Sequence, residues 1–395
     1  MIKSNPLILP VAGLACLAGL VAATVTPARA DDALDPAALQ ALDATVLEAI
    51  AAERFAGAVI QVQRGNDAYG KAYGERSVDP KGKPMLPDTI FDVASLTKVV
   101  ATAPSIMVLV DRELLDPDEP VARYLPEFVG DGREKVTVAQ LLIHTSGLPP
   151  ILPRTDPPWE GHETGIGLGL ASALRTEPGA EFRYSDVNFI LLGEIVRRVS
   201  GHRLDAFSRA ALFEPLGMSD TRFRPPRRLR GRIAPTERTA RTGLIHGQVH
   251  DPAARAMEGV AGHAGLFSTV PDLGRFCAMM VNKGTLEGTR VLSEKAVQSM
   301  TRNQMPRRFG LRRSDLRRGY GWDIESPFSS PRSELFSADS FGHTGWTGGA
   351  LWIDPAIPGF AILMANRNHP TERKNIKDVR ADVFTHAAEA MGRGD

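Results

Sequence analysis

A serine and a lysine three residues apart are the residues of this chain with the clearest chemical potential. Residues 95–98 read Ser-Leu-Thr-Lys, the single S-x-x-K of a 395-residue sequence, and the largely apolar segment 89–94 leads up to them. If a helix begins at Ser95, Lys98 lies about one turn later on the same face. An amine beside a hydroxyl can make a serine nucleophilic. A serine N-cap followed by a lysine in the first turn is a common structural pattern, and an isolated S-x-x-K is weak evidence, so catalysis needs support from elsewhere.

A second candidate group stands just before an apolar helical pattern. Residues 184–186 read Tyr-Ser-Asp and precede residues 187–199, which Gly201 closes. A phenol held in a loop before a helix can act as a general base when a nearby cation lowers its pKa. The alternative is structural: Ser185 or Asp186 forms the N-cap and Tyr184 is a packed aromatic residue.

A third candidate is the segment 343–349, which reads His-Thr-Gly-Trp-Thr-Gly-Gly and precedes a strand pattern. Small residues beside an edge strand let a substrate backbone approach, and main-chain N–H groups directed into a cleft can form an oxyanion hole. The structural alternative is a tight strand connection that requires glycines.

Other chemical patterns are weak or absent. His246 and His250 have the spacing of helical metal ligands, but Gly247 lies between them and no H-E-x-x-H occurs, so we expect no metal. No serine lies in a G-x-S-x-G, which argues against an α/β-hydrolase. No nucleotide fingerprint has the required context, and we expect no cofactor. His144 and His263 lie in glycine-flanked turns, and we interpret them as structural.

The elements that must position these groups follow from periodicity and turn signals. Asp35-Pro36 predicts a helix N-cap and first residue, and Gly65-Asn66 predicts a hairpin. The predicted strands are 58–63, 67–73, 349–353 and 359–365; the predicted helices are 36–50, 96–115 with a kink at Pro104, 187–199, and one from about 375, with Ile376, Val379 and Val383 inward.

The strand patterns lie at the two ends of the chain, and a mostly helical pattern fills residues 96 to 290. Isolated hairpins are marginally stable, so the terminal strands must pair with each other. We therefore predict an α/β fold of the α+β sandwich type: an antiparallel sheet flanked by terminal helices, with an inserted helical lobe. The sheet lobe comprises about 31–95 and 300–395, the helical lobe about 96–299, and a ligand cleft lies between them.

The first 30 residues have the features of a cleavable signal peptide. Lys3 precedes an apolar run, and Ala28-Arg29-Ala30 is an A-x-A site, which predicts a cut after Ala30 and a mature domain of residues 31–395. A membrane anchor and, because of Cys16, a lipoprotein are the alternatives. We expect a periplasmic or secreted protein that meets the membrane only transiently, through this peptide.

Composition describes an ordinary globular protein, with 43% hydrophobic and 24% charged residues. Without Lys3 and Arg29, 45 basic residues face 46 acidic ones, a net charge of −1 that does not suggest nucleic acid. Cys277 is the one cysteine left, which excludes an internal disulfide. Arginines cluster in 222–232 and 307–318; we interpret these stretches as solvated loops, with contact to an anionic envelope polymer as the alternative. We expect a monomer.

Taken together, the three motifs resemble those of the serine β-lactamase and penicillin-binding-protein superfamily. That family has S-x-x-K, then Y-x-N or S-x-N, then K-T-G or H-T-G, in this order along the chain. The tyrosine and the wide spacing are similar to the branch of class C β-lactamases, DD-peptidases and family VIII esterases. The segments 141–148 and 259–268 add to the likeness, which extends over about residues 35–390.

The resemblance implies a role for each motif. Ser95 would be the nucleophile that forms an acyl-enzyme, and Lys98 and Tyr184 would move the proton. The N–H groups of Ser95 and Trp346 would form the oxyanion hole. Asp186, His343, Thr344 and Gly345 would contact the substrate.

Two residues depart from the family pattern. Asp186 stands where asparagine is usual; it cannot donate to a substrate carbonyl, and it would favour a charged Lys98, which leaves Tyr184 as the base. His343 stands where β-lactamases have lysine and would often be neutral at pH 7, since its reference pKa is about 6.5. Both departures argue against a β-lactamase.

The sequence therefore predicts an exported serine hydrolase acting on D-alanyl peptides of the cell wall. A carboxylesterase and a class C-like β-lactamase are the enzymatic alternatives. A catalytically silent peptidoglycan-binding or sensor domain is the alternative from another class, against which the intact set of Ser95, Lys98 and Tyr184 argues.

Overall fold

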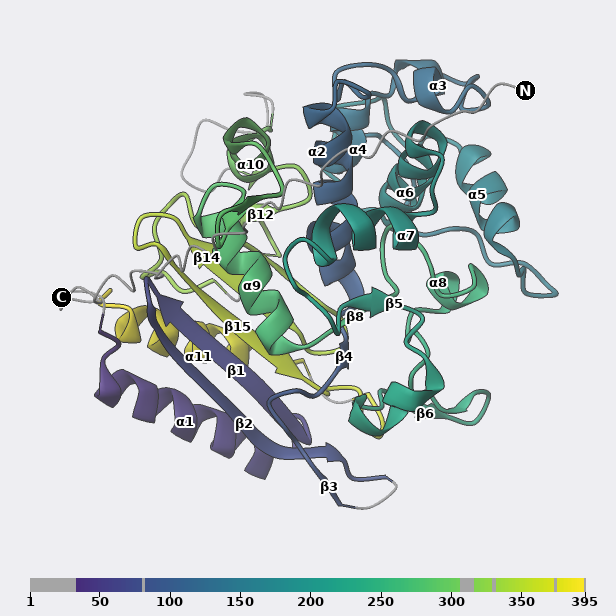
Figure 1. The fold of residues 1–395 in the computed structure, drawn as a ribbon. Coiled ribbons are helices and arrows are strands. Elements are labelled where there is room, and N and C mark those ends of the chain that lie inside the picture. The colour runs from purple at the N-terminus through teal and green to yellow at the C-terminus, as the bar shows by residue number, and fades with distance from the viewer. Residues whose placement is uncertain (1–32, 80–81, 306–315, 329–331, 373–374, 394–395) are drawn as a thin grey trace, which may run out of the picture.

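A large antiparallel sheet is the central element of the computed structural model, which describes residues 33–79, 82–305, 316–328, 332–372 and 375–393 (Figure 1). Its strand order is β11-β12-β13-β14-β15-β1-β2-β3. The bounds are β1 Gly57–Arg64, β2 Asp67–Ser77, β3 Lys83–Pro84, β11 Arg317–Arg318, β12 Asp323–Glu325, β13 Phe341–Thr344, β14 Ala350–Asp354 and β15 Gly359–Ala365. The expected signal sequence, residues 1–30, lies outside the described residues.

The two ends of the chain meet in this sheet. Strand β1 pairs antiparallel with β15, in a register that runs from Ala58 opposite Ala365 to Arg64 opposite Gly359. It also pairs with β2 across the predicted Gly65-Asn66 turn. The expected pairing of terminal strands is therefore confirmed.

Helices cover both faces of the sheet (Figure 1). Helix α1 (Pro36–Ala51), capped by Asp35 as predicted, and helix α11 (Lys377–Ala390) pack on one face. Side chains alternate along a strand, so Ile60 faces this pair of helices, whereas Val59 belongs to the core on the other side. On that other face lies α9 (Val270–Val281), which contacts β1 and β15. Helix α9 comes from the segment expected to form the helical lobe, but it packs on the sheet.

The inserted lobe is built around α6 (Asp186–Ser200) and α2 (Ala103–Asp111). Ser185 caps α6, and Gly201 ends it with a left-handed φ of 75°, as the sequence predicts. The remaining helices are α3 Val121–Tyr124, α4 Val138–Leu142, α5 His162–Leu170, α7 Leu204–Ser208, α8 Pro252–Ala256 and α10 Glu294–Thr301.

Short strands occur within and just before the segment 96–290, which we expected to be mostly helical. A three-stranded sheet has the order β4-β8-β5, and two strand pairs, β6-β7 and β9-β10, lie at other positions. Their bounds are β4 Phe91–Asp92, β5 Arg222–Phe223, β6 Arg238–Thr239, β7 Gly243–Leu244, β8 Leu266–Ser268, β9 Thr285–Leu286 and β10 Thr289–Arg290. With two or three residues each, these strands have too little periodicity to be recognised in the sequence.

The predicted continuous helix 96–115 is wrong in its details. A 3₁₀ turn, η2 (Ala94–Leu96), is followed by a π-helical segment, η3 (Lys98–Thr102), and only then by α2, which ends at Asp111. The irregular part thus lies before Pro104, which occupies the first turn of α2, where a proline is tolerated. The stretch Ala94–Asp111 is apolar and long enough to cross a membrane, but it is mostly buried and forms part of the core.

Candidate active site

Ser95 and Lys98 lie in contact, as the spacing predicts. Ser95 belongs to the 3₁₀ turn η2, and Lys98 begins the π-helical segment η3. The Lys98 Nζ donates to the Ser95 Oγ at 3.1 Å. Ser95 is partly exposed, whereas Lys98 is fully buried. The hydroxyl can therefore reach a substrate while the amine stays inside the protein.

The turn that presents Ser95 is fixed by its neighbours. Ala94 has a φ of 48°, a left-handed conformation that is unusual for alanine. The buried Asp92 stabilises it, because one carboxylate oxygen accepts the Ala94 N–H at 2.9 Å and the other accepts the His250 N–H at 2.6 Å. Burial raises the pKa of Asp92, and these two N–H groups oppose the rise. The Thr97 hydroxyl donates to the Ala94 carbonyl at 2.6 Å.

The Lys98 ammonium is surrounded by acceptors. Besides Ser95, it donates to the carbonyl of His263 at 3.0 Å and pairs with Asp186 Oδ1 at 2.8 Å. Burial lowers the pKa of Lys98, but Asp186 and Tyr184 outweigh that effect, so its pKa is raised. Lys98 is therefore a cation at pH 7.

Tyr184 and Asp186 occupy the turn before α6 and its first residue. The Tyr184 ring lies 5.0 Å from Lys98 Nζ, a cation–π distance. The ring is held by His144, at a centroid distance of 4.5 Å, and by Phe328, at 5.1 Å. Tyr184 is partly exposed. The first two motifs of the sequence are thus brought together around one ammonium group.

Replacing Asp186 with asparagine should lower the pKa of Lys98. Burial would then act on the ammonium without the carboxylate that opposes it. The ¹³Cε resonance of Lys98 in selectively labelled protein should titrate at lower pH in Asp186→Asn than in the parent. The matched control is Asp205→Asn, whose carboxylate pairs with Arg203 and Arg224. An unchanged titration in Asp186→Asn would contradict the coupling.

The third motif precedes strand β14, as predicted, and its first two residues also end the strand before it. His343 and Thr344 are the last residues of β13, and Gly345 begins the connection to β14. Strand β13 is not an edge strand, although its pairing with β12 is limited to Gly342 opposite Asp323. A Cβ at Gly345 would lie 2.6 Å from the Val93 carbonyl, so only glycine lets this connection approach the Ser95 turn.

His343 is buried and neutral. Its Nδ1 donates to the Thr344 carbonyl at 2.8 Å. Burial, followed by the charges of Arg318 and Lys98, lowers the pKa of His343 well below its usual value. The ring therefore offers no positive charge to a substrate carboxylate at pH 7, as the sequence suggested.

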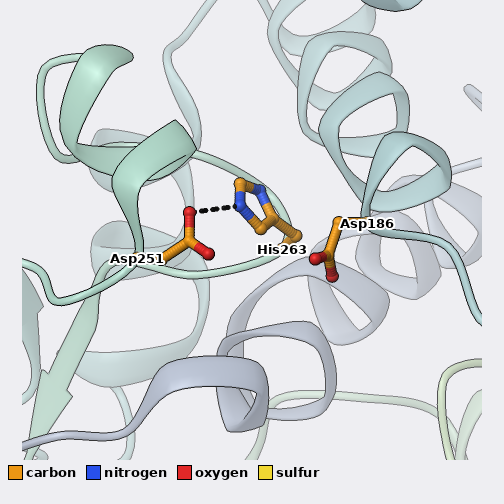
Figure 2. Close-up of side chains that lie close together, drawn as sticks. All are labelled: Asp186, Asp251 and His263. Carbon is orange, nitrogen blue, oxygen red and sulfur yellow. Dashed lines mark hydrogen bonds and ion pairs between the residues drawn. The ribbon is translucent and has the colours of Figure 1, made fainter. Parts of the chain in front are cut away.

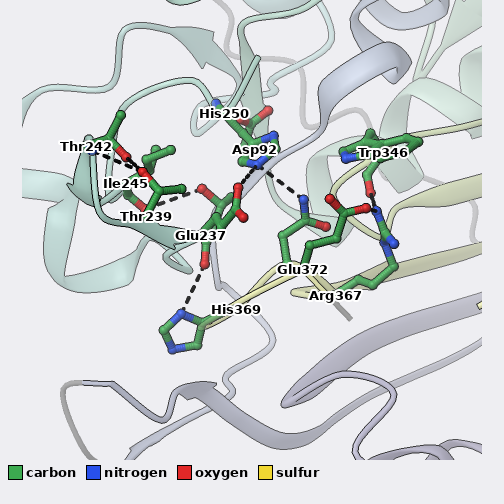
Figure 3. A network of polar contacts seen from close by, with 12 residues as sticks. Asp92, Glu237, Thr239, Thr242, Ile245, His250, Trp346, Arg367, His369 and Glu372 are labelled. Atoms are coloured by element: carbon green, nitrogen blue, oxygen red, sulfur yellow. Dashed lines mark hydrogen bonds and ion pairs between the residues drawn. The ribbon is translucent and has the colours of Figure 1, made fainter. Parts of the chain in front are cut away.

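Three side chains fix the β13–β14 connection, residues 345–349. Arg380 Nη2 donates to the carbonyls of Gly345 and Gly349, each at 2.8 Å. Arg367 donates to the Trp346 carbonyl at 3.1 Å through Nε and at 2.9 Å through Nη2 (Figure 3). The Thr347 hydroxyl donates to the main-chain carbonyl of Asp92 at 2.7 Å and so ties this connection to the Ser95 turn.

The candidate site opens into a cavity of about 240 Å³. Trp346, with 59% of its surface exposed, stands on its wall. The lining residues are Ala94, Ser95, Asp186, His250, Asp251, Pro252, His263, Ala264 and Trp346. A larger cavity of about 450 Å³ lies between α9 and strands β1 and β2, and none of the predicted site residues lines it.

Asp186, Asp251 and His263 converge at this cavity (Figure 2), with one potential ligand atom of each within 4.8 Å of the others. His263 Nε2 lies 2.9 Å from Asp251 Oδ1. Burial raises the pKa of Asp251, but His263 outweighs it, and the net pKa is lowered. Both carboxylates already have basic partners, and a divalent cation here would lie beside the Lys98 ammonium. We therefore assign no metal to this group.

The histidines that we considered as metal ligands have separate partners. His246 Nε2 lies 3.0 Å from the Ile233 carbonyl, and His250 Nε2 lies 3.1 Å from Glu237 Oε2 (Figure 3). Their spacing in the sequence does not bring them to one centre.

Several residues that contact the site carried no recognised signal. We interpreted His144 and His263 as structural. The His144 ring packs against the Tyr184 ring, and the main-chain carbonyl of His263 accepts a hydrogen bond from Lys98. Their place in glycine-flanked phrases was the available clue. Asp92, Asp251 and Arg380 reach the site through long-range packing, and no motif distinguishes them.

The chain is similar both to a family model and to individual proteins. A family model described as Beta-lactamase matches residues 42–384. Over 312 residues the chain is 32% identical to a protein of Escherichia coli (strain K12) named "Putative D-alanyl-D-alanine carboxypeptidase"; the match covers 71% of this chain and 70% of that protein.

Solved structures share the fold. A penicillin-binding protein homologue from Caulobacter crescentus superposes with a TM-score of 0.72 at 25% identity, covering 91% of this chain and 98% of that one. A family VIII carboxylesterase superposes with a TM-score of 0.70 at 23% identity, with coverage of 91% and 98%. The predicted fold class is thereby confirmed.

Proposed function

The chain belongs to the beta-lactamase family of serine hydrolases, and from this premise we propose that it is an exported D-alanyl-D-alanine carboxypeptidase acting through an acyl-Ser95 intermediate. The observation that carries the proposal is the contact between the Ser95 hydroxyl and the buried Lys98 ammonium, which Asp186 and Tyr184 flank. A domain without catalytic function would have no use for a buried cation maintained beside a partly exposed serine.

The proposed reaction has two steps. Ser95 Oγ adds to the carbonyl carbon of the scissile amide while its proton passes to Tyr184, which reacts as its phenolate. The phenol so formed gives that proton to the leaving nitrogen as the C–N bond breaks, which leaves a free amine and the acyl-Ser95 ester. Water then hydrolyses the acyl ester and regenerates the hydroxyl. Lys98 stays protonated because of Asp186, so it cannot accept the proton and instead stabilises the developing negative charge.

The substrate class rests on three supports. The relatives that share 31–32% identity are named as carboxypeptidases for D-alanyl-D-alanine. Residues 1–30 have the pattern of a signal peptide, which would bring the enzyme to the cell wall. The H-T-G of residues 343–345 occurs among DD-peptidases of the resembled family.

One observation favours a second candidate, a carboxylesterase. A D-alanyl-D-alanine peptide ends in a carboxylate, and the neutral His343 gives that group less hold than a lysine would. A simple ester needs no such cation. We therefore propose a D-alanyl-D-alanine peptide as the substrate and treat a simple ester as the main alternative.

The test offers the mature protein three substrates in parallel: a peptide ending in D-Ala-D-Ala, a fluorescent penicillin and p-nitrophenyl butyrate. Release of D-alanine together with stable penicillin labelling, mapped to Ser95 by mass spectrometry, would support the carboxypeptidase. Rapid ester turnover without D-alanine release would replace it with the esterase. Rapid penicillin turnover without lasting label would instead identify a β-lactamase.

A further inference from the structure

Arg380, in the first turn of α11, is a buried cation with an unusual set of partners. Its side chain donates to two main-chain carbonyls, those of Gly345 and Gly349. Among the described residues, no carboxylate lies within ion-pair distance of it. Burial, and then the charge of Arg367, lower the pKa of Arg380 to about 9, so the guanidinium remains charged at pH 7. An unpaired buried charge is costly, which indicates a specific use.

The carbonyl of Gly345 belongs to the same peptide unit as the N–H of Trp346. In a trans peptide these two groups point in opposite directions. The described part of the chain has cis peptides at Asp156-Pro157 and His369-Pro370, and the Gly345–Trp346 bond is trans. The Gly345 carbonyl accepts the Gly348 N–H at 3.2 Å within the turn, and Arg380 holds it from the side of α11 at 2.8 Å, so the Trp346 N–H points away from α11. No described residue accepts a hydrogen bond from this N–H, and Trp346 lines the same cavity as Ser95.

A charged donor on a carbonyl also changes the other end of the amide. Hydrogen bonds to ionised groups are stronger than neutral ones, and hydrogen bonds in a chain polarise one another. The Trp346 N–H therefore becomes a better donor. Such a donor stabilises the negative oxygen that develops on the substrate carbonyl in the transition state.

We propose that Arg380 is a positioning residue that orients and polarises the Gly345–Trp346 peptide, so that the Trp346 N–H serves as a strong oxyanion donor. This inference rests on the proposed function, because it assumes that acylation of Ser95 is the reaction assisted.

The chain provides a matched control in Arg367. This arginine is also largely buried, and it supports the same connection, with its guanidinium 4.9 Å from the Trp346 ring. It holds the carbonyl of Trp346, however, which belongs to the next peptide unit, whose N–H is that of Thr347. Loss of Arg367 should loosen the connection without removing charge from the oxyanion donor.

The test compares Arg380→Met, Arg380→Lys and Arg367→Met in hydrolysis of p-nitrophenyl butyrate. Arg380→Met should lower kcat roughly 10²-fold and leave KM within about twofold, because loss of oxyanion stabilisation acts on the transition state. Arg380→Lys keeps the charge but cannot reach both carbonyls equally well, so its kcat should lie between those of the parent and Arg380→Met. Arg367→Met should reduce kcat less than either.

A spectroscopic readout separates polarisation from mere loosening. A p-nitrophenyl alkylphosphonate forms a bond from phosphorus to Ser95 Oγ as p-nitrophenolate leaves, which places a phosphonyl oxygen where the oxyanion would lie. The ³¹P chemical shift of this adduct should differ from that of the parent in the Arg380 variants and should equal it in Arg367→Met. Thermal unfolding shows whether each variant is folded. If Arg380→Met is unfolded, Arg380→Lys is compared with Arg367→Met instead.

Two outcomes overturn the inference: equal losses in the variants at Arg380 and Arg367, or a ³¹P resonance that does not move in the Arg380 variants. Failure of the proposed function gives a different result, because the parent would then lack Ser95-dependent turnover and phosphonate labelling altogether.

Discussion

Replacing Ser95 with alanine should lower turnover of every substrate of this enzyme roughly 10³-fold or more and abolish covalent labelling. The alanine has no oxygen to form the acyl ester, whereas the cavity, the Lys98–Asp186 pair and the Trp346 connection remain. Since Ser95 is partly exposed and its one described side-chain hydrogen bond is to Lys98, its loss should affect folding little. Measurement of kcat/KM for p-nitrophenyl butyrate and of labelling by a fluorescent penicillin or phosphonate checks this.

Ser105 provides the control for this substitution. It lies in α2, ten residues further along the same segment, and its buried hydroxyl has no hydrogen-bond partner in the part of the chain that the structure describes. Ser105→Ala should therefore retain the parent activity. Residual turnover in Ser95→Ala equal to that of Ser105→Ala would exclude Ser95 as the nucleophile and with it the acyl-enzyme mechanism.

The second large effect is expected from Tyr184→Phe, which should lower kcat by roughly 10²–10⁴-fold, the usual contribution of a positioned proton-transfer group. The ring contacts with His144 and Phe328 do not involve the hydroxyl, so the phenylalanine should keep its place. The loss should appear in the acylation step, measured by stopped-flow release of p-nitrophenol. Tyr124→Phe, remote from the site on α3, is the control.

A double substitution distinguishes base catalysis by Tyr184 from a packing effect. In the Asp186→Asn background the pKa of Lys98 should be lower, and a neutral amine could take over as base. Tyr184→Phe should then cost less than it does in the parent. A cost that is the same in both backgrounds would indicate that Tyr184 acts through packing rather than as the base.

Elements with strong local signals could be predicted from the sequence. The Asp35 cap, the Gly65-Asn66 turn and the Gly201 terminator each specify a boundary through contacts within a few residues. Strands β11 to β13 could not be predicted, because they have two to four residues each and Gly342 interrupts the apolar pattern of β13. The irregular start of helix 94–111 is also invisible in the sequence, since it depends on Asp92 and on partners far along the chain.

The same distinction applies to the site. Ser95, Lys98, Tyr184 and Asp186 lie in short motifs, and the resemblance of these motifs to those of the β-lactamase superfamily predicted that they meet. The neutrality of His343 was expected from its residue type, but the strong fall in its pKa comes from burial and from Arg318, which only the folded structure reveals. Arg380 had no signal, because a single arginine in an amphipathic helix normally faces solvent.

The contact of α11 with the β13–β14 connection also affects when, during synthesis of the chain, the site can form. Ser95 is synthesised early, but the guanidinium that holds the Gly345–Trp346 peptide arrives 285 residues later, and β15 must emerge before β1 has its second neighbour. We therefore expect the candidate site to be complete only when nearly the whole chain has been synthesised. We expect an enzyme assembled in this order to be inactive while it is being made and, if it is exported unfolded, until it folds at its destination.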